Sequence, residues 1–314
     1  MKKFVAFTLL SCFAATAIAQ RPAPLRPTHT DIDYAGEGNP RQMLDLYLPE
    51  NADGGKPLPL IVFIHGGGWA KGDKRSGAGK LREFVGSGKY AGASLAYRLS
   101  DEAQWPAQIH DCKAGIRWLR ANAEKYGIDP DKIAVWGTSA GGHLVAMLGV
   151  SHGVEELEGD LGEHDGVSSE VNCVVNFFGP AELLTMNDHP SVIDHLAANS
   201  PESRLVGGEL SKNPDKAQNA SPITWVSSDD EPSLIVHGTD DKLVPYMQSV
   251  DFEKALEKAG VSTALLTVKG GGHGQGFGRE VNEAVAAFLD HHLHGAEKTV
   301  EDGEVEAAPF TPRR

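Results

Sequence analysis

The residues GTSAG at 137–141 match the pattern G-x-S-x-G, with an apolar run before them and an apolar helical pattern after them. Between a strand and a helix this pattern is typical of a nucleophile elbow, a sharp turn that presents its serine hydroxyl at a helix N-terminus. A serine hydroxyl becomes nucleophilic when a base stands beside it. We therefore predict that Ser139 is a nucleophile, and that the chain supplies it with a base and an acid.

A histidine follows the last apolar strand pattern. Of the thirteen histidines, His273 lies in the loop GGGHG, between that strand and the final helical pattern. This position suits a general base. His237 also follows a strand pattern, whereas His143 and His110 fall within helical patterns. We predict structural roles for these three and assign the base to His273.

The stretch HGTDDKLVP offers two adjacent carboxylates after the penultimate strand pattern, Asp240 and Asp241. A carboxylate that accepts a hydrogen bond from the base fixes the tautomer of the imidazole and stabilises the imidazolium. The chain order serine, aspartate, histidine is the order found in α/β-hydrolases. Two neighbouring side chains cannot both point at one histidine, and the residues alone leave the choice between them open.

Three consecutive glycines stand in HGGGW, residues 65–69, at the end of another strand pattern. Glycine loses more conformational freedom on folding than any other residue, so such a run indicates a backbone that must approach something closely. That partner is either a bound phosphate or a charge that exists only during a reaction. The phosphate patterns G-x-x-x-x-G-K-[ST] and G-x-G-x-x-G before a helix are both missing from the sequence.

Apolar runs and amphipathic patterns alternate along the chain, which predicts one α/β domain over residues 31–294 with a mostly parallel sheet between two helical layers. The expected strands are 43–49, 60–66, 90–98, 132–137, 173–179, 233–238 and 263–270. The expected helices are 106–127, 248–260 and 279–293. The polar, proline-broken stretch 180–232 is expected to pass over one end of the sheet and to cover a binding pocket.

The two ends of the chain have their own patterns. Residues 1–19 combine a basic head, an apolar stretch and a small-x-small ending, which predicts a signal peptide cleaved before Gln20 and a secreted or periplasmic protein. An uncleaved anchor and a lipoprotein site at Cys12 are the alternatives. Residues 20–30 are Pro-rich and expected to be extended, and 295–314 are expected to form a disordered acidic tail. After removal of the signal we expect no integral membrane segment.

Composition narrows the class of partner. The 314 residues carry a formal net charge of −14 and no basic run, which argues against a nucleic-acid partner. No His/Cys cluster has the spacing of a zinc site, so we expect no metal and no cofactor. Beyond the signal, Cys112 and Cys173 are the only cysteines. They either pair, as export allows, or serve as small buried apolar residues.

Taken together, HGGGW, GTSAGG, HGTDDKLVP and GGGHG resemble the α/β-hydrolase esterase/lipase superfamily, and in particular small secreted bacterial esterases related to feruloyl and acetyl-xylan esterases. The stretches LDLYLP, YRLS and WPAQIHDCKAGIRWLRANA extend the resemblance over about residues 31–293. In that family the fifth position of the HGxxD motif is the catalytic acid. The resemblance therefore implies that Asp241 is the acid and that Asp240 is a solvated neighbour.

The resemblance also assigns the glycine loop. The family's HGGG loop lends backbone N–H groups to an oxyanion hole, and the matching positions here are Gly67 and Gly68, joined by the N–H of Ala140. His65 and Trp69 are expected to hold this loop, with Trp69 a candidate for the wall of the substrate pocket. Such donors are worth about 3–4 kcal/mol each to a tetrahedral intermediate.

The sequence thus predicts a serine carboxylesterase that acts on short acyl esters, with acetyl or feruloyl groups on polysaccharide as candidate substrates. An amidase, formamidase or peptidase could use the same three side chains, because acyl transfer is one chemistry with different leaving groups. A non-catalytic binding protein on the same fold is the remaining alternative, although such a protein is expected to have lost a member of the triad.

Overall fold

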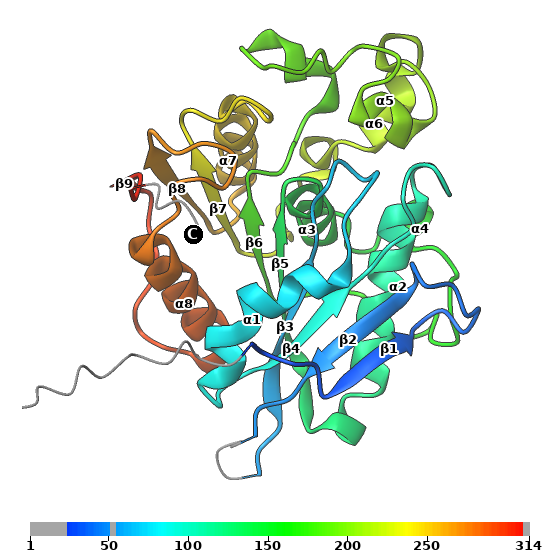
Figure 1. Ribbon diagram of the computed structural model, residues 1–314, viewed down its shortest axis with the longest axis vertical. Helices are drawn as coiled ribbons and strands as arrows, with labels where there is room; N and C mark the ends of the chain where they lie inside the picture. Colours follow the sequence, from blue (N-terminus) through cyan, green and yellow to red (C-terminus); the bar gives the residue numbers. More distant parts are fainter. Residues whose placement is uncertain (1–23, 51–54, 310–314) are drawn as a thin grey trace, which may run out of the picture.

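A nine-stranded sheet runs through the described residues of the computed structural model, 24–50 and 55–309 (Figure 1). Its strands are β1 (His29–Asp33), β2 (Met43–Tyr47), β3 (Leu58–Ile64), β4 (Ala91–Leu95), β5 (Ile128–Thr138), β6 (Cys173–Phe177), β7 (Ser233–Gly238), β8 (Thr263–Lys269) and β9 (Gly303–Glu306). All seven strands expected from the apolar runs are present. β1 and β9 are additional, and β1 begins within the predicted 20–30 segment.

The strand order β1-β2-β4-β3-β5-β6-β7-β8-β9 brings the ends that carry the motifs to one edge of the sheet. β2 is antiparallel to β1 and β4, and every other pairing is parallel. Ile64, the last residue of β3, pairs with Gly137 of β5. Because carboxyl ends of neighbouring parallel strands coincide, the glycine run after β3 and the serine after β5 must emerge side by side.

Alternate residues of each central strand feed two different apolar layers. In β3, Leu60 and Val62 pack with helices α2 and α3, whereas Ile61 and Phe63 pack with α1 and α8 on the opposite face (Figure 1). This alternation is the two-residue period of a strand buried on both faces. The helices are α1 (Gly77–Gly86), α2 (Ala107–Ala121), α3 (Ala140–Val150), α4 (Glu155–Glu158), α5 (Pro201–Val206), α6 (Pro214–Asn219), α7 (Met247–Ala259) and α8 (Arg279–His294).

Residues 180–232, called the cover segment below, connect β6 to β7 and lie beyond the carboxyl ends of the strands (Figure 1). They form short helices only: η3 (Leu183–Asp188), α5, η4 (Leu210–Lys212), α6 and η5 (Pro222–Trp225). Proline at the start of three of these helices suits the first turn, where its missing N–H costs no hydrogen bond. The predicted excursion is therefore a structured layer over the motif-bearing edge.

The prediction of a disordered tail is wrong for the described residues up to 309. β9 pairs in parallel with β8, and Val300 and Val305 pack against the α1/α8 layer. The Asp302 carboxylate also accepts a hydrogen bond from the Leu265 N–H at 3.0 Å. The acidic composition of the tail hid a short strand whose half-buried residues alternate with exposed glutamates. Residues 310–314 lie outside the described residues, as does the predicted signal peptide.

Cys112 and Cys173 are both free and fully buried, so the small-apolar alternative holds and the pair is not a disulfide. Burial raises the pKa of both thiols, which keeps them protonated and unreactive. Among the helices of the described residues, none has the length and apolarity needed to cross a bilayer.

Candidate active site

Ser139 occupies a strained turn between β5 and α3. Its φ of 56° and ψ of −123° are unusual for a residue with a side chain. The turn can close because Gly137 and Gly141 leave room: a Cβ on Gly137 would lie 2.1 Å from the Gly141 carbonyl oxygen, and one on Gly141 would lie 2.2 Å from that of Ile64. The two glycines of the motif thus allow the packing that exposes the Ser139 hydroxyl.

His273 lies in the loop after β8, as predicted, and faces Ser139. Its Nε2 is 3.0 Å from Ser139 Oγ, and its Nδ1 is 2.6 Å from Asp241 Oδ2. An ionised carboxylate can only accept, so Nδ1 donates to Asp241, and Nε2 of the neutral imidazole is left to accept the serine proton. The ring of Phe178 packs against the imidazole with 4.5 Å between centroids.

Asp241 is buried, and its two oxygens accept four hydrogen bonds. Oδ1 accepts from the N–H groups of Leu243 and Val244 at 2.8 and 3.0 Å. Oδ2 accepts from His273 and from His237 Nε2, which is 3.2 Å away. Burial alone would raise the pKa of Asp241, but the hydrogen bonds from His237 and His273, together with the electrostatic attraction of the two imidazoles, outweigh it and hold that pKa below its ordinary value.

Asp240 is exposed, and its carboxylate accepts a hydrogen bond only from Thr239 within the described residues. Its backbone N–H donates to the Gly271 carbonyl, which joins the aspartate loop to the histidine loop at 2.8 Å. Of the two neighbours that the residues alone could not separate, only Asp241 contacts His273.

The glycine loop supplies backbone N–H groups beside Ser139. Gly67, Gly68 and Ala140 line the same cavity as Ser139 and His273. Gly67 has a φ of 121°, and a Cβ there would lie 2.1 Å from the Lys71 carbonyl oxygen, so no other residue fits. Within the described residues, no hydrogen bond uses the N–H of Gly67 or Gly68. These donors remain available to a ligand atom.

Trp69 and His65 hold this loop from inside. Trp69 is 1% exposed, and its Nε1 donates to His143 Nδ1 at 3.2 Å, while His143 Nε2 donates to the Ala220 carbonyl at 2.7 Å. Burial lowers the pKa of His143 to about 4, so the imidazole is neutral and Nδ1 can accept. His65 stacks on Tyr97 at 4.4 Å. Trp69 also lines the cavity, though its polar atom is already engaged.

The cavity over Ser139 has a volume of about 870 Å³. The glycine loop and α1 form one side of it, and the cover segment forms the other. The cover segment contributes Pro180, Ile193, His195, Pro201, Glu202 and Arg204. The lining of the cavity is therefore partly apolar and partly charged, and part of it comes from the cover segment.

Two models of known protein families match the sequence. The family model named BD-FAE matches residues 44–256, which is more than half of the sequence. The matched region includes the glycine loop after β3, the Ser139 turn after β5 and the aspartate loop after β7. The chain belongs to the BD-FAE family. A second model, described as TAP-like protein, matches residues 211–303. Together with the parallel sheet and its helical layers, these matches confirm the predicted α/β-hydrolase fold.

Curated relatives of this BD-FAE chain include esterase LipC of Mycobacterium tuberculosis, 32% identical over 240 residues. The alignment covers 75% of the present chain and 57% of LipC, so the chain spans little more than half the length of that relative.

Solved structures of similar fold include a truncated carbohydrate esterase from gut microbiota, with a TM-score of 0.79 and 34% identity. That match covers 84% of this chain and 95% of the other. Esterase Est2 of Thermogutta terrifontis matches with a TM-score of 0.67 and 26% identity, over 86% and 95% of the two chains.

Several residues that surround the site cannot be predicted from the sequence alone. The sequence predicts a structural role for His237, and what it does not reveal is the contact of His237 with the Asp241 carboxylate, which Ser249 Oγ supports from the other side of the ring at 2.7 Å. Its position at the end of β7, directly before the two aspartates, was the available signal. Phe178 and the buried pair His195 and Glu202 carry no local motif, because tertiary packing alone brings them to the cavity.

Proposed function

We propose that this BD-FAE family protein is a serine carboxylesterase that hydrolyses short acyl esters. The observation that carries the proposal is the continuous line of contacts from Ser139 Oγ through His273 to Asp241, at 3.0 and 2.6 Å. Gly67, Gly68 and Ala140 line the same cavity, and their backbone N–H groups are the donors that we propose for the oxyanion. The names of the similar proteins, which are esterases, support the same reaction class.

In the first step His273 Nε2 accepts the Ser139 proton while Oγ forms a bond to the ester carbonyl carbon. The carbonyl oxygen takes up the electron pair and accepts hydrogen bonds from Gly67, Gly68 and Ala140. Collapse of this intermediate breaks the bond to the alcohol oxygen, which leaves with the proton from His273. Throughout, the Asp241 carboxylate holds the Nδ1 proton and stabilises the imidazolium.

In the second step a water molecule attacks the acyl-serine carbonyl while His273 Nε2 takes one of its protons. The second tetrahedral intermediate uses the same donors. Its collapse releases the carboxylic acid and returns the proton to Ser139 Oγ. The two steps together add one water across the ester bond, and each donor acts on a charge that exists only in the intermediate.

We place the substrate among esters of small acyl groups, with acetyl or feruloyl groups on polysaccharide as the leading class. The likeness to a carbohydrate esterase at 34% identity supports a carbohydrate alcohol. The charged residues that the cover segment brings to the cavity also suit a polar alcohol better than a long lipid chain. The predicted signal peptide, residues 1–19, adds the proposal that the protein is exported and acts outside the cytoplasm.

The test is Ser139→Ala assayed with p-nitrophenyl acetate, methyl ferulate and acetylated xylan. We expect turnover of every ester cleaved by the wild type to fall to background while the circular dichroism spectrum is unchanged. Undiminished hydrolysis by the variant would refute the assignment. Preference for anilides or formamides in the same panel would favour an amidase, and failure of a fluorophosphonate to label the wild type would favour a binding protein.

A further inference from the structure

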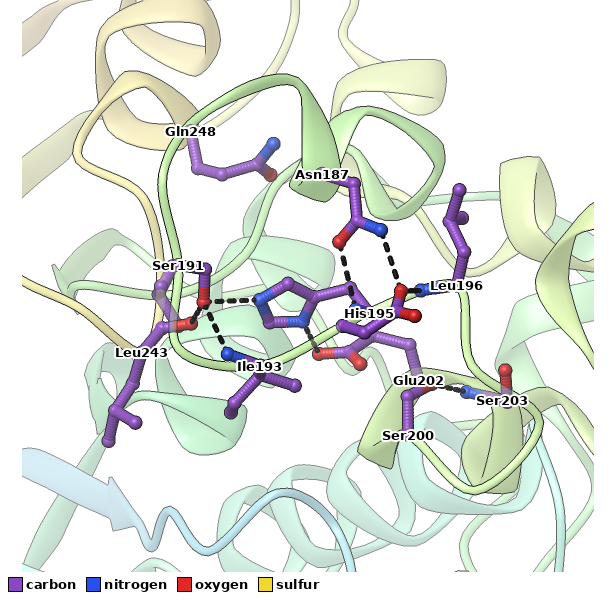
Figure 2. A network of polar contacts seen from close by, with 12 residues as sticks. Asn187, Ser191, Ile193, His195, Leu196, Ser200, Glu202, Ser203, Leu243 and Gln248 are labelled. Atoms are coloured by element: carbon purple, nitrogen blue, oxygen red, sulfur yellow. Dashed lines mark hydrogen bonds and ion pairs between the residues drawn. The ribbon is translucent and has the colours of Figure 1, made fainter.

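The cover segment contains a buried polar pair that the proposed reaction does not use. His195 and Glu202 are 1% and 3% exposed, and His195 Nδ1 lies 3.0 Å from Glu202 Oε1 (Figure 2). Both residues line the cavity over Ser139. A buried ionisable pair at this position calls for a physical reason, because apolar residues could fill the same space.

At one end the pair is tied to the loop that carries Asp241. Ser191 Oγ lies 3.0 Å from His195 Nε2, and 3.1 and 3.2 Å from the carbonyl oxygens of Lys242 and Leu243 (Figure 2). The Val192 N–H donates to the same Lys242 carbonyl at 2.8 Å. Ser191 therefore holds the backbone immediately after Asp241, in the segment whose N–H groups bind its carboxylate.

At the other end the pair is tied to the glycine loop. Glu202 stands in the first turn of α5, next to Pro201. A Cβ on Gly68 would lie 3.3 Å from Pro201 Cβ, so the start of α5 packs directly on the loop that carries the backbone donors. Ser200 Oγ fixes this helix start by accepting the Ser203 N–H at 3.0 Å.

The contribution of this pair to the stability of the fold does not explain its presence. Replacing a buried ion pair with well-packed apolar residues is often neutral or stabilising. Glu202 Oε2 is buried and, within the described residues, has no hydrogen-bond partner, which adds a desolvation cost. What the pair does supply is direction, because an imidazole and a carboxylate bond only at defined angles. The contacts therefore serve to fix the relative positions of the segments that they join.

We propose that Ser191, His195 and Glu202 form a positioning relay that sets the distance between the Asp241 loop and the glycine loop. The inference rests on the proposed esterase function. None of the three residues touches the reacting atoms in the mechanism above, so each acts through the loops that it holds. Loosening the relay lets the acid loop and the donor loop drift relative to Ser139, and a small drift from the productive geometry slows the chemical step.

The experiment compares Ser191→Ala, Glu202→Leu and Glu202→Gln with the wild type on p-nitrophenyl acetate. We expect Ser191→Ala and Glu202→Leu each to lower kcat about tenfold with KM within about twofold, since the loss falls on the transition state. Glu202→Gln keeps an acceptor oxygen for His195 Nδ1 and should restore most of kcat. The double variant Ser191→Ala/Glu202→Leu should be little slower than the worse single variant, because both changes break one relay.

The matched control is Ile128→Val, which shortens a buried side chain at the start of β5, far from Ser139, and lowers stability without touching the relay. We expect it to lower the melting temperature and leave kcat unchanged. Equal kcat losses in Ile128→Val and Ser191→Ala would overturn the relay, as would additive effects in the double variant. If hydrolysis requires Ser139 but ignores Ser191 and Glu202, the relay alone is wrong. If the wild type hydrolyses no ester, the proposed function and the relay fall together.

Discussion

The Asp241 carboxylate and the His273 imidazole are joined by a 2.6 Å hydrogen bond although 32 residues separate them in the chain. Parallel pairing of β7 with β8 places the two loops next to each other. His237, the penultimate residue of β7, contacts the same carboxylate oxygen. These contacts hold the Asp241 carboxylate ionised and in one orientation, as its proposed role beside a general base requires.

Replacing Asp241 with Asn should cost about four orders of magnitude in kcat, because the amide can present an N–H to His273 and favour the wrong tautomer. Asp240→Asn changes the same chemical group one residue away, on an exposed side chain, and should leave kcat within about twofold, as surface changes usually do. Steady-state kinetics with p-nitrophenyl acetate separate the two. A large loss in Asp240→Asn with an active Asp241→Asn would reverse the assignment.

Gly67→Ala tests the glycine loop. A Cβ at this position would overlap the Lys71 carbonyl, and its φ of 121° is strained for alanine. We expect the loop to shift and one oxyanion donor to be lost, with kcat falling about a hundredfold. Gly79→Ala is the control, since a Cβ there meets nothing within 4 Å. Wild-type kcat in Gly67→Ala would show that this N–H is not used.

The part of the site that could be predicted from sequence is the part set by local backbone rules. An apolar strand, a glycine-flanked serine and a helix are enough to predict the Ser139 turn. Gly137 is required by a contact within the turn itself, whereas Gly141 is required by the Ile64 carbonyl at the end of β3. His273 and the two aspartates follow strands, and parallel strands deliver their carboxyl ends to one edge. The choice of Asp241 over Asp240 needed the family resemblance, since the two share one loop and one chemistry.

The parts of the site and the fold that could not be predicted depend on contacts between segments that are far apart in the sequence. Ser191 contacts Lys242, which is 51 residues away in the sequence, and Trp69 contacts His143, which is 74 residues away. No local sequence pattern indicates either contact. β9 was missed for a related reason: a four-residue strand with glutamates on its outer side has little hydrophobic signal of its own. It forms because β8 already offers an open edge for pairing.

Glu253 on α7 should make stability fall as pH rises. It is buried beside Asp302, and burial first, then the charge and hydrogen bond of Asp302, raise the pKa of Glu253 to about 8. In the unfolded chain the pKa of a glutamate is about 4.3. Between these values the folded state binds the extra proton, so each unit of pH rise favours unfolding.

Glu253→Gln should therefore raise the melting temperature at pH 8 and change it much less at pH 4.5, where the folded state holds the proton and the unfolded chain has lost it only in part. Glu280→Gln, an exposed change on α8, provides the comparison and should show no such difference. Thermal unfolding followed by circular dichroism at the two pH values measures both. A Glu253→Gln effect that is equal at pH 4.5 and pH 8 would contradict the assignment of the proton.

Removal of residues 299–314 should affect both stability and catalysis, because β9 does more than extend the sheet. Val300 and Val305 pack against the α1/α8 layer, and their loss should cost about 2 kcal/mol. Directly after β9, the Ala308 N–H donates to the Gly276 carbonyl at 2.8 Å, within the loop that carries His273. We expect the truncated protein to have a lower melting temperature and, at 25 °C, a lower kcat.

A shorter truncation that removes only 310–314 is the control for this prediction and should behave as the full chain does, since it keeps β9 and Ala308. Restoring the acidic residues of the tail in a scrambled order should not recover either property, because pairing with β8 needs Val305 on its inner side. If the long truncation keeps wild-type kcat while losing stability, then β9 supports the sheet edge but does not hold the His273 loop. If it loses neither, the packing of β9 contributes nothing to the folded enzyme.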